Sequence, residues 1–279
     1  CALPISDNSE VERVVTTGNH MAYLKIAEGC DKRCSYCIIP KIRGRFRSVP
    51  MQELLNEAKR LASEGVKELV LVAQETTLYG KDLTGEKQLP LLLHELCKIE
   101  GIEWIRLLYC YPEEITDELI KVIKTEEKVC NYIDMPIQHS ENRILQRMGR
   151  RTSREDLVAV IKKLRKEIPD ITIRTTLITG FPGESQEDHE GLMNFVEECQ
   201  FDRLGVFTYS PEEDTLAATF EDQIDEEVKE ERRDELMSLQ QEISYEHTQQ
   251  LVGKTIKVMV EGYLFEDDIY VGRSYMDAP

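Results

Sequence analysis

The sequence lacks long apolar runs, phosphate-binding glycine loops and an excess of basic residues. No stretch approaches the ~18 consecutive apolar residues that a membrane-spanning helix needs. Neither a Walker pattern nor G-x-G-x-x-G occurs, so nucleotide hydrolysis has little support. The 35 Lys and Arg residues face 53 Asp and Glu residues, and the resulting net charge of -18 is the opposite of that expected for a general nucleic-acid binder. We therefore expect a cytoplasmic protein that has no membrane partner.

The hydrophobic residues, 41% of the chain, fall in a regular alternation of strand-like and helix-like segments. Pro50, Ser185 and the pair Thr152 and Glu155, which has capping-box spacing, mark the starts of three helices. Alternating units of this kind predict a parallel sheet covered by helices. Six units fit, whereas a closed eight-stranded barrel needs about 250 residues. The prediction is an α/β fold, an open partial (β/α)6 TIM-like barrel. Its strand-like runs are 21–27, 68–73, 104–109, 131–135, 171–178 and 204–209.

Other segments flank this predicted barrel core at 21–224. Residues 1–20 are mostly polar and are predicted to form an N-terminal linker. A long charged helix is predicted for 225–251. The last segment, 252–279, alternates like β-strands but is too short for an independent domain, so we interpret it as the beginning of a small β-module. Because the chain begins with cysteine rather than methionine, we expect it to be part of a longer protein.

Three cysteines give the strongest chemical signal. Cys30, Cys34 and Cys37 have the spacing C-x3-C-x2-C directly after the first predicted strand. Three thiolates in one short loop can hold three corners of a cubane iron–sulfur cluster and leave the fourth iron open. The alternative is a structural zinc site, which needs four ligands and would take a distant one such as Cys97 or His94.

This loop, placed after the first strand of a partial barrel, resembles the radical S-adenosylmethionine (SAM) superfamily. Three longer segments are similar to its methylthiotransferase branch: GCDKRCSYCIIPKIRGRFRS at 29–48, MPIQHSENRILQRMG at 135–149 and TTLITGFPGE at 175–184. The resemblance implies a four-iron four-sulfur cluster on the three cysteines and SAM bound to its open iron. It also implies a 5′-deoxyadenosyl radical that abstracts hydrogen from carbon, and an electron donor. It further implies a second cluster in a preceding domain and a C-terminal TRAM β-module that begins within 252–279.

The same resemblance assigns five residues to the SAM pocket. Tyr36 would lie near the adenine, although ordinary aromatic packing is the alternative. Gln74 and Glu75 end the second strand, where a carboxylate suits the ammonium group of SAM; for Glu75 the alternative is a helix cap. Gln138 follows the fourth strand. Arg174 is a charged residue within the fifth strand and needs a partner, which a SAM carboxylate would provide.

Shorter patterns address the substrate. YCYP at 109–112, PIQH at 136–139 and YSPEE at 209–213 resemble the RimO-type branch, whose members modify an aspartate of the twelfth protein of the small ribosomal subunit. Glu212 is the most telling position, because methylthiotransferases acting on isopentenyl-adenosine in tRNA, the alternative, tend to have a basic residue there. An acidic enzyme would also attract a basic ribosomal protein. A non-catalytic iron–sulfur or zinc scaffold is the alternative from another class.

Two basic stretches interrupt the acidic chain. Residues 38–48 carry one lysine and three arginines without an acid, and 142–154 carry five arginines without an acid. They predict either contact with phosphate, including peripheral contact with ribosomal RNA, or ion pairs with the protein's own carboxylates.

Overall fold

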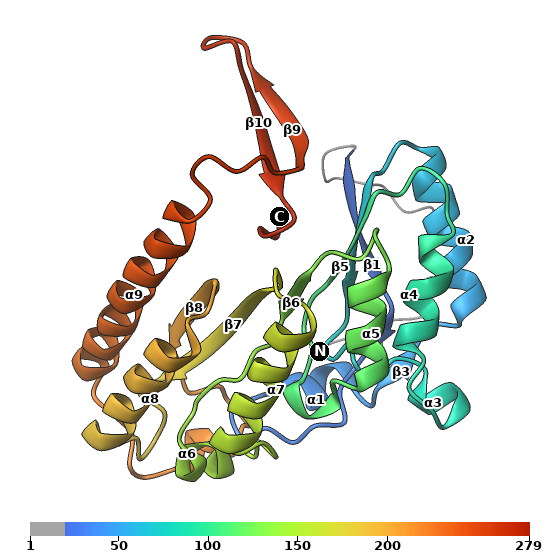
Figure 1. Cartoon of the computed structure of the whole chain (residues 1–279). Helices are drawn as coiled ribbons and strands as arrows, with labels where there is room; N and C mark the ends of the chain where they lie inside the picture. Colours follow the sequence, from blue (N-terminus) through green and yellow to red (C-terminus); the bar gives the residue numbers. More distant parts are fainter. Residues whose placement is uncertain (1–19) are drawn as a thin grey trace.

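The computed structural model describes residues 20–279 and contains an open barrel of six parallel strands (Figure 1). The strands pair in the orders β1-β4-β5 and β6-β7-β8, and a parallel bridge between Ile105 and Val129 joins the two groups. Within the described residues β8 does not pair with β1, so the predicted open, partial barrel is confirmed. The strands are β1 (Met21–Lys25), β4 (Glu68–Val72), β5 (Trp104–Leu107), β6 (Tyr132–Asp134), β7 (Thr172–Thr179) and β8 (Arg203–Thr208).

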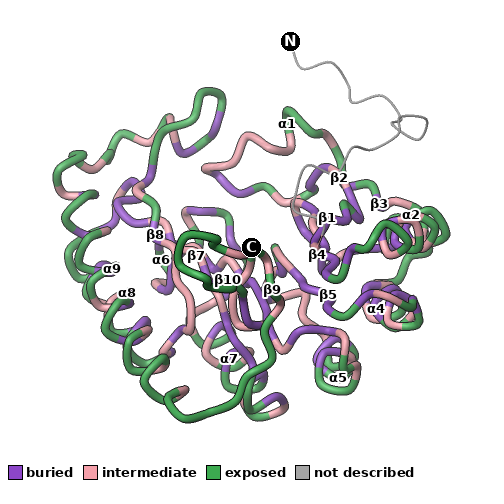
Figure 2. The backbone as a smooth tube through the Cα atoms, turned by 90° about the horizontal axis from the view of Figure 1, so that it is seen from above, coloured by how far each residue is buried: buried purple, intermediate pink, exposed green. Residues whose placement is uncertain are grey.

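Amphipathic helices cover the outer face of these strands. In α2 (Met51–Ser63), Leu54, Ala58 and Leu61 form one buried stripe that packs in the same core as the outward side chains of the strands. Figure 2 shows buried backbone around the strands and exposed backbone on the outer sides of the helices. The other helices on this face are α4 (Leu89–Cys97), α5 (Asp117–Thr125), α7 (Arg154–Glu167) and α8 (Gln186–Cys199).

The start of α7 differs by one residue from the prediction. Ser153, not Thr152, caps the helix, because its hydroxyl accepts the N–H of Asp156 while the Asp156 carboxylate accepts the N–H of Ser153. The Thr152 hydroxyl is buried without a hydrogen-bond partner in the described part of the chain. The same capping box, built by Ser185 with Asp188, starts α8 where the sequence places it.

Short elements cluster at the carboxyl end of the barrel. The first strand-like run ends early: β1 stops at Lys25 and a separate β2 (Ala27–Glu28) pairs antiparallel with β3 (Arg47–Ser48). The remaining short elements are α1 (Ile39–Arg43), α3 (Lys81–Thr84), α6 (Asn142–Arg147) and the 3₁₀ turns Pro112–Glu114 and Ala217–Thr219.

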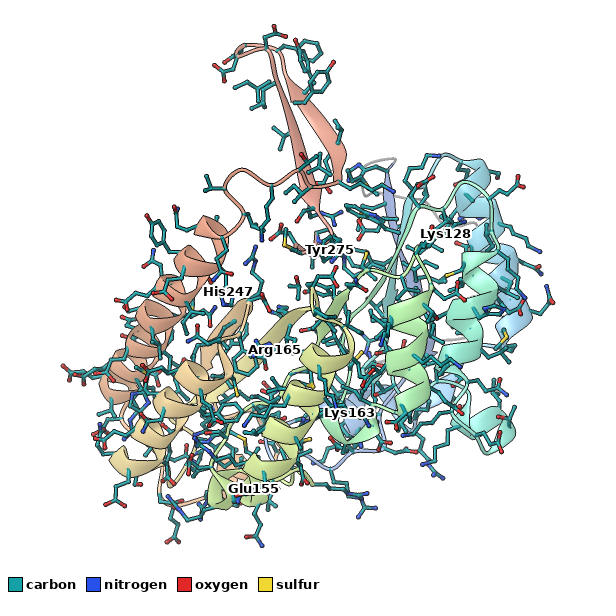
Figure 3. All side chains as sticks on the ribbon, viewed as in Figure 1. Lys128, Glu155, Lys163, Arg165, His247 and Tyr275 are labelled. Carbon is teal, nitrogen blue, oxygen red and sulfur yellow. The ribbon has the colours of Figure 1, made fainter. Side chains whose placement is uncertain are left out.

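The C-terminal part consists of the predicted long helix, α9 (Glu226–Gln249), and a hairpin of β9 (Val258–Leu264) and β10 (Ile269–Ser274). The segment after β10 closes the amino end of the barrel. Tyr275, labelled in Figure 3, donates a hydrogen bond of 3.0 Å to the Asp170 carbonyl, and its own carbonyl accepts one of 2.6 Å from Arg106. The opposite, carboxyl end of the strands is therefore the end left for a site.

Residues 1–19 of the predicted linker lie outside the described residues. No helix among residues 20–279 is both long and apolar enough to cross a bilayer.

Candidate active site

The three motif cysteines lie on one loop at the carboxyl end of β1. Cys30 and Cys34 are buried, Cys37 is half-buried, and all three are free thiols. In Figure 1 this loop leads into α1, at the end of the barrel opposite the C-terminus. Parallel barrels place their chemistry at this end, because the connections that follow the strands converge there.

Backbone contacts with neighbouring segments fix the loop. Gly29 has a φ of +79°, and a Cβ there would lie 2.2 Å from the Arg45 carbonyl oxygen, so only glycine fits. The Cys30 N–H donates to the Gly44 carbonyl at 3.1 Å. On the other side the Ser35 N–H donates to the Met148 carbonyl at 2.9 Å. These contacts fix the position of the loop relative to the segments around Gly44 and Met148.

The electrostatics of the thiols show that they influence one another. Burial raises the pKa of the Cys30 thiol to about 11, and the Glu75 carboxylate and the other two thiols act in the same direction. Burial also raises the pKa of Cys37, with a smaller contribution from Cys34. Such thiols stay protonated near neutral pH until a cation compensates the thiolate charge.

The thiols suit a cluster better than a single ion. Within residues 20–279 no three Cys, His, Asp or Glu side chains converge on one ion position. In a cubane each thiolate binds a different iron, so convergence on one point is not required. The distant zinc ligands that the sequence left open are engaged elsewhere, since His94 lies 2.7 Å from Glu126 and Cys97 adjoins the same carboxylate. The zinc alternative therefore has no ligand set in the described chain.

Two polar residues at the end of β4 face the cysteine loop. The Gln74 amide oxygen accepts the Gly29 N–H at 2.7 Å, which ties the start of the loop to β4. Glu75 is buried, and its carboxylate lies 3.7 Å from the Lys32 ammonium. Burial raises the pKa of Glu75 to about 7, while Lys32 opposes the shift. Glu75 is not a helix cap in this structure, and a buried carboxylate that already faces one ammonium can accept another.

Lys32 and Arg150 belong to the site but were missed by sequence reasoning. The Lys32 ammonium donates to Glu113 at 3.1 Å and to Glu114 at 2.9 Å, so it links the cysteine loop to the β5–α5 connection. The Arg150 guanidinium is buried 4.4 Å from the ring centre of Tyr111. Lys32 lies between Cys30 and Cys34, and this position could have indicated from the sequence that it belongs to the site. The residues around Arg150 in the sequence do not indicate that its side chain is buried.

The other predicted pocket residues each contact a defined neighbour within the described chain. Tyr36 packs edge-on against Phe181, with ring centres 6.5 Å apart, so aromatic packing accounts for at least part of its role. Gln138 has a φ of +75°, and its backbone pairs with β7. Arg174 donates to Asp134 at 2.6 Å, so the partner that a charged strand residue requires comes from the neighbouring strand.

The second basic stretch, 142–154, is largely neutralised by the protein's own carboxylates. Arg143 pairs with Asp188, Arg147 pairs with Asp222 at 2.7 Å, and Arg154 pairs with Glu141 at 2.6 Å. In the first stretch Arg45 keeps an 89% exposed side chain and only a loose pair with Asp31 at 3.5 Å. In the second stretch Arg151 is exposed and has no ion pair in the described part of the chain, so each stretch keeps at least one cation that could meet an external anion.

Comparison with known proteins decides the family. The model of the radical SAM superfamily matches residues 24–196, which include the end of β1, the cysteine loop and the whole of β4, β5, β6 and β7. The chain belongs to the radical SAM superfamily. Membership implies SAM and a four-iron four-sulfur cluster as cofactors. A solved member, the radical SAM methyltransferase TsrM from Kitasatospora setae, shares the fold with a TM-score of 0.57 at 18% identity. The match covers 67% of this chain and 36% of TsrM.

Closer relatives within the superfamily are similar along nearly the whole chain. The ribosomal protein uS12 methylthiotransferase RimO of Lachnoclostridium phytofermentans is 63% identical over 273 residues, 97% of this chain and 62% of the relative. RimO of Clostridium perfringens is 57% identical over 267 residues, 96% of this chain and 60% of the relative. The predicted resemblance to RimO-type enzymes is confirmed. The chain spans about three-fifths of the length of these relatives.

The residues present fit the cofactors of this superfamily. A cavity of about 550 Å³ adjoins the cysteine loop and is lined by Cys30, Lys32, Arg33, Pro40 and Gly44. The donor set, three free thiols on a loop that the surrounding backbone holds in place, is that of a cluster with one open iron. The cluster would supply the electron that cleaves SAM; the chain's own part is to hold the thiols and to offer Glu75 to a cation.

Proposed function

We propose that this chain is the radical SAM core of a methylthiotransferase that modifies an aspartate side chain of ribosomal protein uS12. The observation that carries the proposal is the 63% identity to a RimO enzyme over 97% of the chain. The cysteine loop at the carboxyl end of the barrel supports it. Cys30, Cys34 and Cys37 would bind the cluster, and Tyr36, Gln74, Glu75, Gln138 and Arg174 would surround SAM.

Five further parts belong to the same proposal. A second cluster, outside these residues, would be needed for sulfur transfer, and an external electron donor would reduce the cluster on Cys30, Cys34 and Cys37. The enzyme would act in the cytoplasm, where its ribosomal substrate is made. The exposed Arg45 region would touch ribosomal RNA at the edge of an assembled particle. The TRAM-like module would begin with the β9–β10 hairpin.

Charge separates the protein substrate from the tRNA alternative. The net charge of -18 favours a basic protein over free RNA, and the arginines of 142–154 that would serve RNA are mostly paired internally. We expect the complete enzyme to bind uS12 with an affinity that falls as salt rises, and to bind bare tRNA no better than an unrelated acidic protein does. Methylthio-adenosine as a product would establish the tRNA alternative instead.

The direct test is anaerobic reconstitution with iron and sulfide, followed by reduction in the presence of SAM. We expect cluster absorbance and release of 5′-deoxyadenosine from this chain, and methylthiolated uS12 only from the complete enzyme. Replacement of Cys34 by alanine should abolish both signals, whereas replacement of Cys199, a buried thiol on α8, should leave both. A chain that binds iron but never cleaves SAM would be the non-catalytic scaffold.

A further inference from the structure

The end of α6 is bonded to the cysteine loop. The Ser35 hydroxyl donates to the Arg147 carbonyl at 2.7 Å, in addition to the bond that the Ser35 N–H makes to the next carbonyl. Gly149, which follows the helix, has a φ of +72°, and a Cβ there would lie 2.8 Å from the Arg33 carbonyl oxygen. Only glycine therefore lets the two segments approach this closely. Arg150, the next residue, lies beside the loop. Figure 1 shows α6 at the same end of the barrel as α1.

The Arg150 side chain is buried but has few partners. It is 7% exposed, and only its Nη2 forms a hydrogen bond, to the Pro136 carbonyl at 2.9 Å. Its Nε and Nη1 are buried without a hydrogen-bond partner in the described part of the chain, and no carboxylate there forms an ion pair with it. A buried cation without a counter-charge is costly in a folded protein. We therefore expect next to Arg150 a negative group that the described chain does not supply.

Arg150 and the cysteine loop line one small cavity. The cavity has a volume of about 120 Å³, and its lining includes Lys32, Cys34, Tyr111, Glu113 and Arg150. Lys32 is already paired with three carboxylates. The other arginines at this cavity, Arg33 and Arg151, are exposed, so water and salt screen their charges. Among the described residues, Arg150 is therefore the buried cation at this cavity that has no carboxylate partner.

The electrostatics agree with this placement. Burial lowers the pKa of Arg150, but the phenols of Tyr36 and Tyr111 and the Cys34 thiol outweigh that effect and raise it. The interaction is mutual, because a positive charge on Arg150 stabilises a negative charge on Cys34. A cluster bound to the three cysteines becomes more negative when it takes up an electron. Arg150 is therefore placed to stabilise the reduced form of such a cluster more than its oxidised form.

We propose that the buried Arg150 guanidinium raises the reduction potential of the cluster held by Cys30, Cys34 and Cys37. In this one-electron step the electron comes from the external donor and remains on the cluster, and Arg150 stays protonated throughout. Net charge and hydrogen bonds around the sulfurs set such potentials, and the protein interior screens a buried charge only weakly. Arg150 is thus a positioning residue that acts through the cluster. The inference rests on the proposed function, because it takes the three thiols to be the cluster's ligands.

The test is the reduction potential of the reconstituted chain, measured without SAM or substrate by dithionite titration and electron paramagnetic resonance. Arg150→Gln removes the charge and should lower the ratio of reduced to oxidised cluster at a given solution potential about tenfold, a shift of about 59 mV for a one-electron couple. Arg150→Lys keeps the charge and should hold this ratio within about twofold of the wild type. Arg151→Gln is the matched control, because it removes the same charge from the exposed neighbouring residue and should leave the potential unchanged.

Three results would overturn the inference. A purely structural role of Arg150 would lower the stability of the Arg150→Gln chain and leave its potential unchanged. A role in binding SAM would raise the Kd of SAM and again leave the potential without SAM unchanged. Equal shifts in Arg150→Gln and Arg150→Lys would show that the charge is not responsible.

A second variant covers the case in which Arg150→Gln binds no cluster. Glu113→Gln removes a negative charge from the same cavity and should make the potential more positive. In that case an unchanged or more negative potential overturns the inference. The proposed function is decided separately, by iron binding and SAM cleavage in the unmodified chain, so the two can fail independently.

Discussion

Replacing Glu68 by glutamine should strongly destabilise the closed amino end of the barrel. The Glu68 carboxylate is fully buried and accepts hydrogen bonds from Arg106, at 2.6 Å, and from Arg273. The Arg106 side chain is also fully buried, and its Nη2 has no hydrogen-bond partner in the described chain. Glutamine keeps the shape but removes the charge, and its amide nitrogen would face a guanidinium. Removing one partner of such a buried pair costs about 3–5 kcal/mol.

The assay is urea denaturation followed by circular dichroism and by tryptophan fluorescence. The single tryptophan, Trp104, is buried in a small cluster with Cys130 and Tyr132, and Tyr275 of the segment after β10 packs against this cluster. Its emission therefore reports whether that segment stays docked. The control is Glu167→Gln, which breaks an exposed pair with Lys124 and should change the free energy of unfolding by about 1 kcal/mol or less.

A loss below about 1 kcal/mol for Glu68→Gln, with unchanged tryptophan emission, would refute the reasoning. Such a result would mean that water or a rearrangement of nearby side chains replaces the hydrogen bonds that the Arg106 and Arg273 guanidinium groups lose. If Trp104 emission changes at a lower urea concentration than the circular dichroism signal, the C-terminal segment undocks before the barrel unfolds.

Two further variants test particular contacts. Although burial alone would raise the pKa of Glu184, its contacts with His139 and Arg232 lower it, so this carboxylate stabilises the fold above its unfolded pKa of about 4.5 and less as the pH falls. We expect Glu184→Gln to lose stability at neutral pH and to approach the wild type in acid. An unchanged difference across that titration would contradict this. Gly29→Ala should destabilise the chain and weaken cluster binding, whereas Gly85→Ala, at a similar φ of +84° in open space, should cost only the backbone strain of about 1–2 kcal/mol. Equal losses would show that contact with the loop around Gly44 is unimportant.

The local sequence determined the elements of this protein. Strand positions followed from apolar runs, and the starts of α2 and α8 from Pro50 and Ser185, because these signals act over a few residues. The cysteine motif indicated its chemistry for the same reason, since all three thiols lie within eight residues. The start of α7 was missed by one residue, because Thr152 and Ser153 are both able to cap and only the fold chooses between them.

Tertiary structure alone decided which charges meet. Arg174 forms an ion pair with Asp134 on the neighbouring strand, and Lys32 forms one with Glu75, which lies 43 residues further along the chain. The arginines of 142–154 were neutralised by partners such as Asp222, whose distance in sequence gives no periodic signal. That β8 does not pair with β1 within the described residues is likewise a property of the sheet, because a strand's own residues do not specify whether a neighbour will pair with it. A site whose residues lie in one loop can therefore be predicted from the sequence. A site whose residues come from different strands can be identified only in the folded structure.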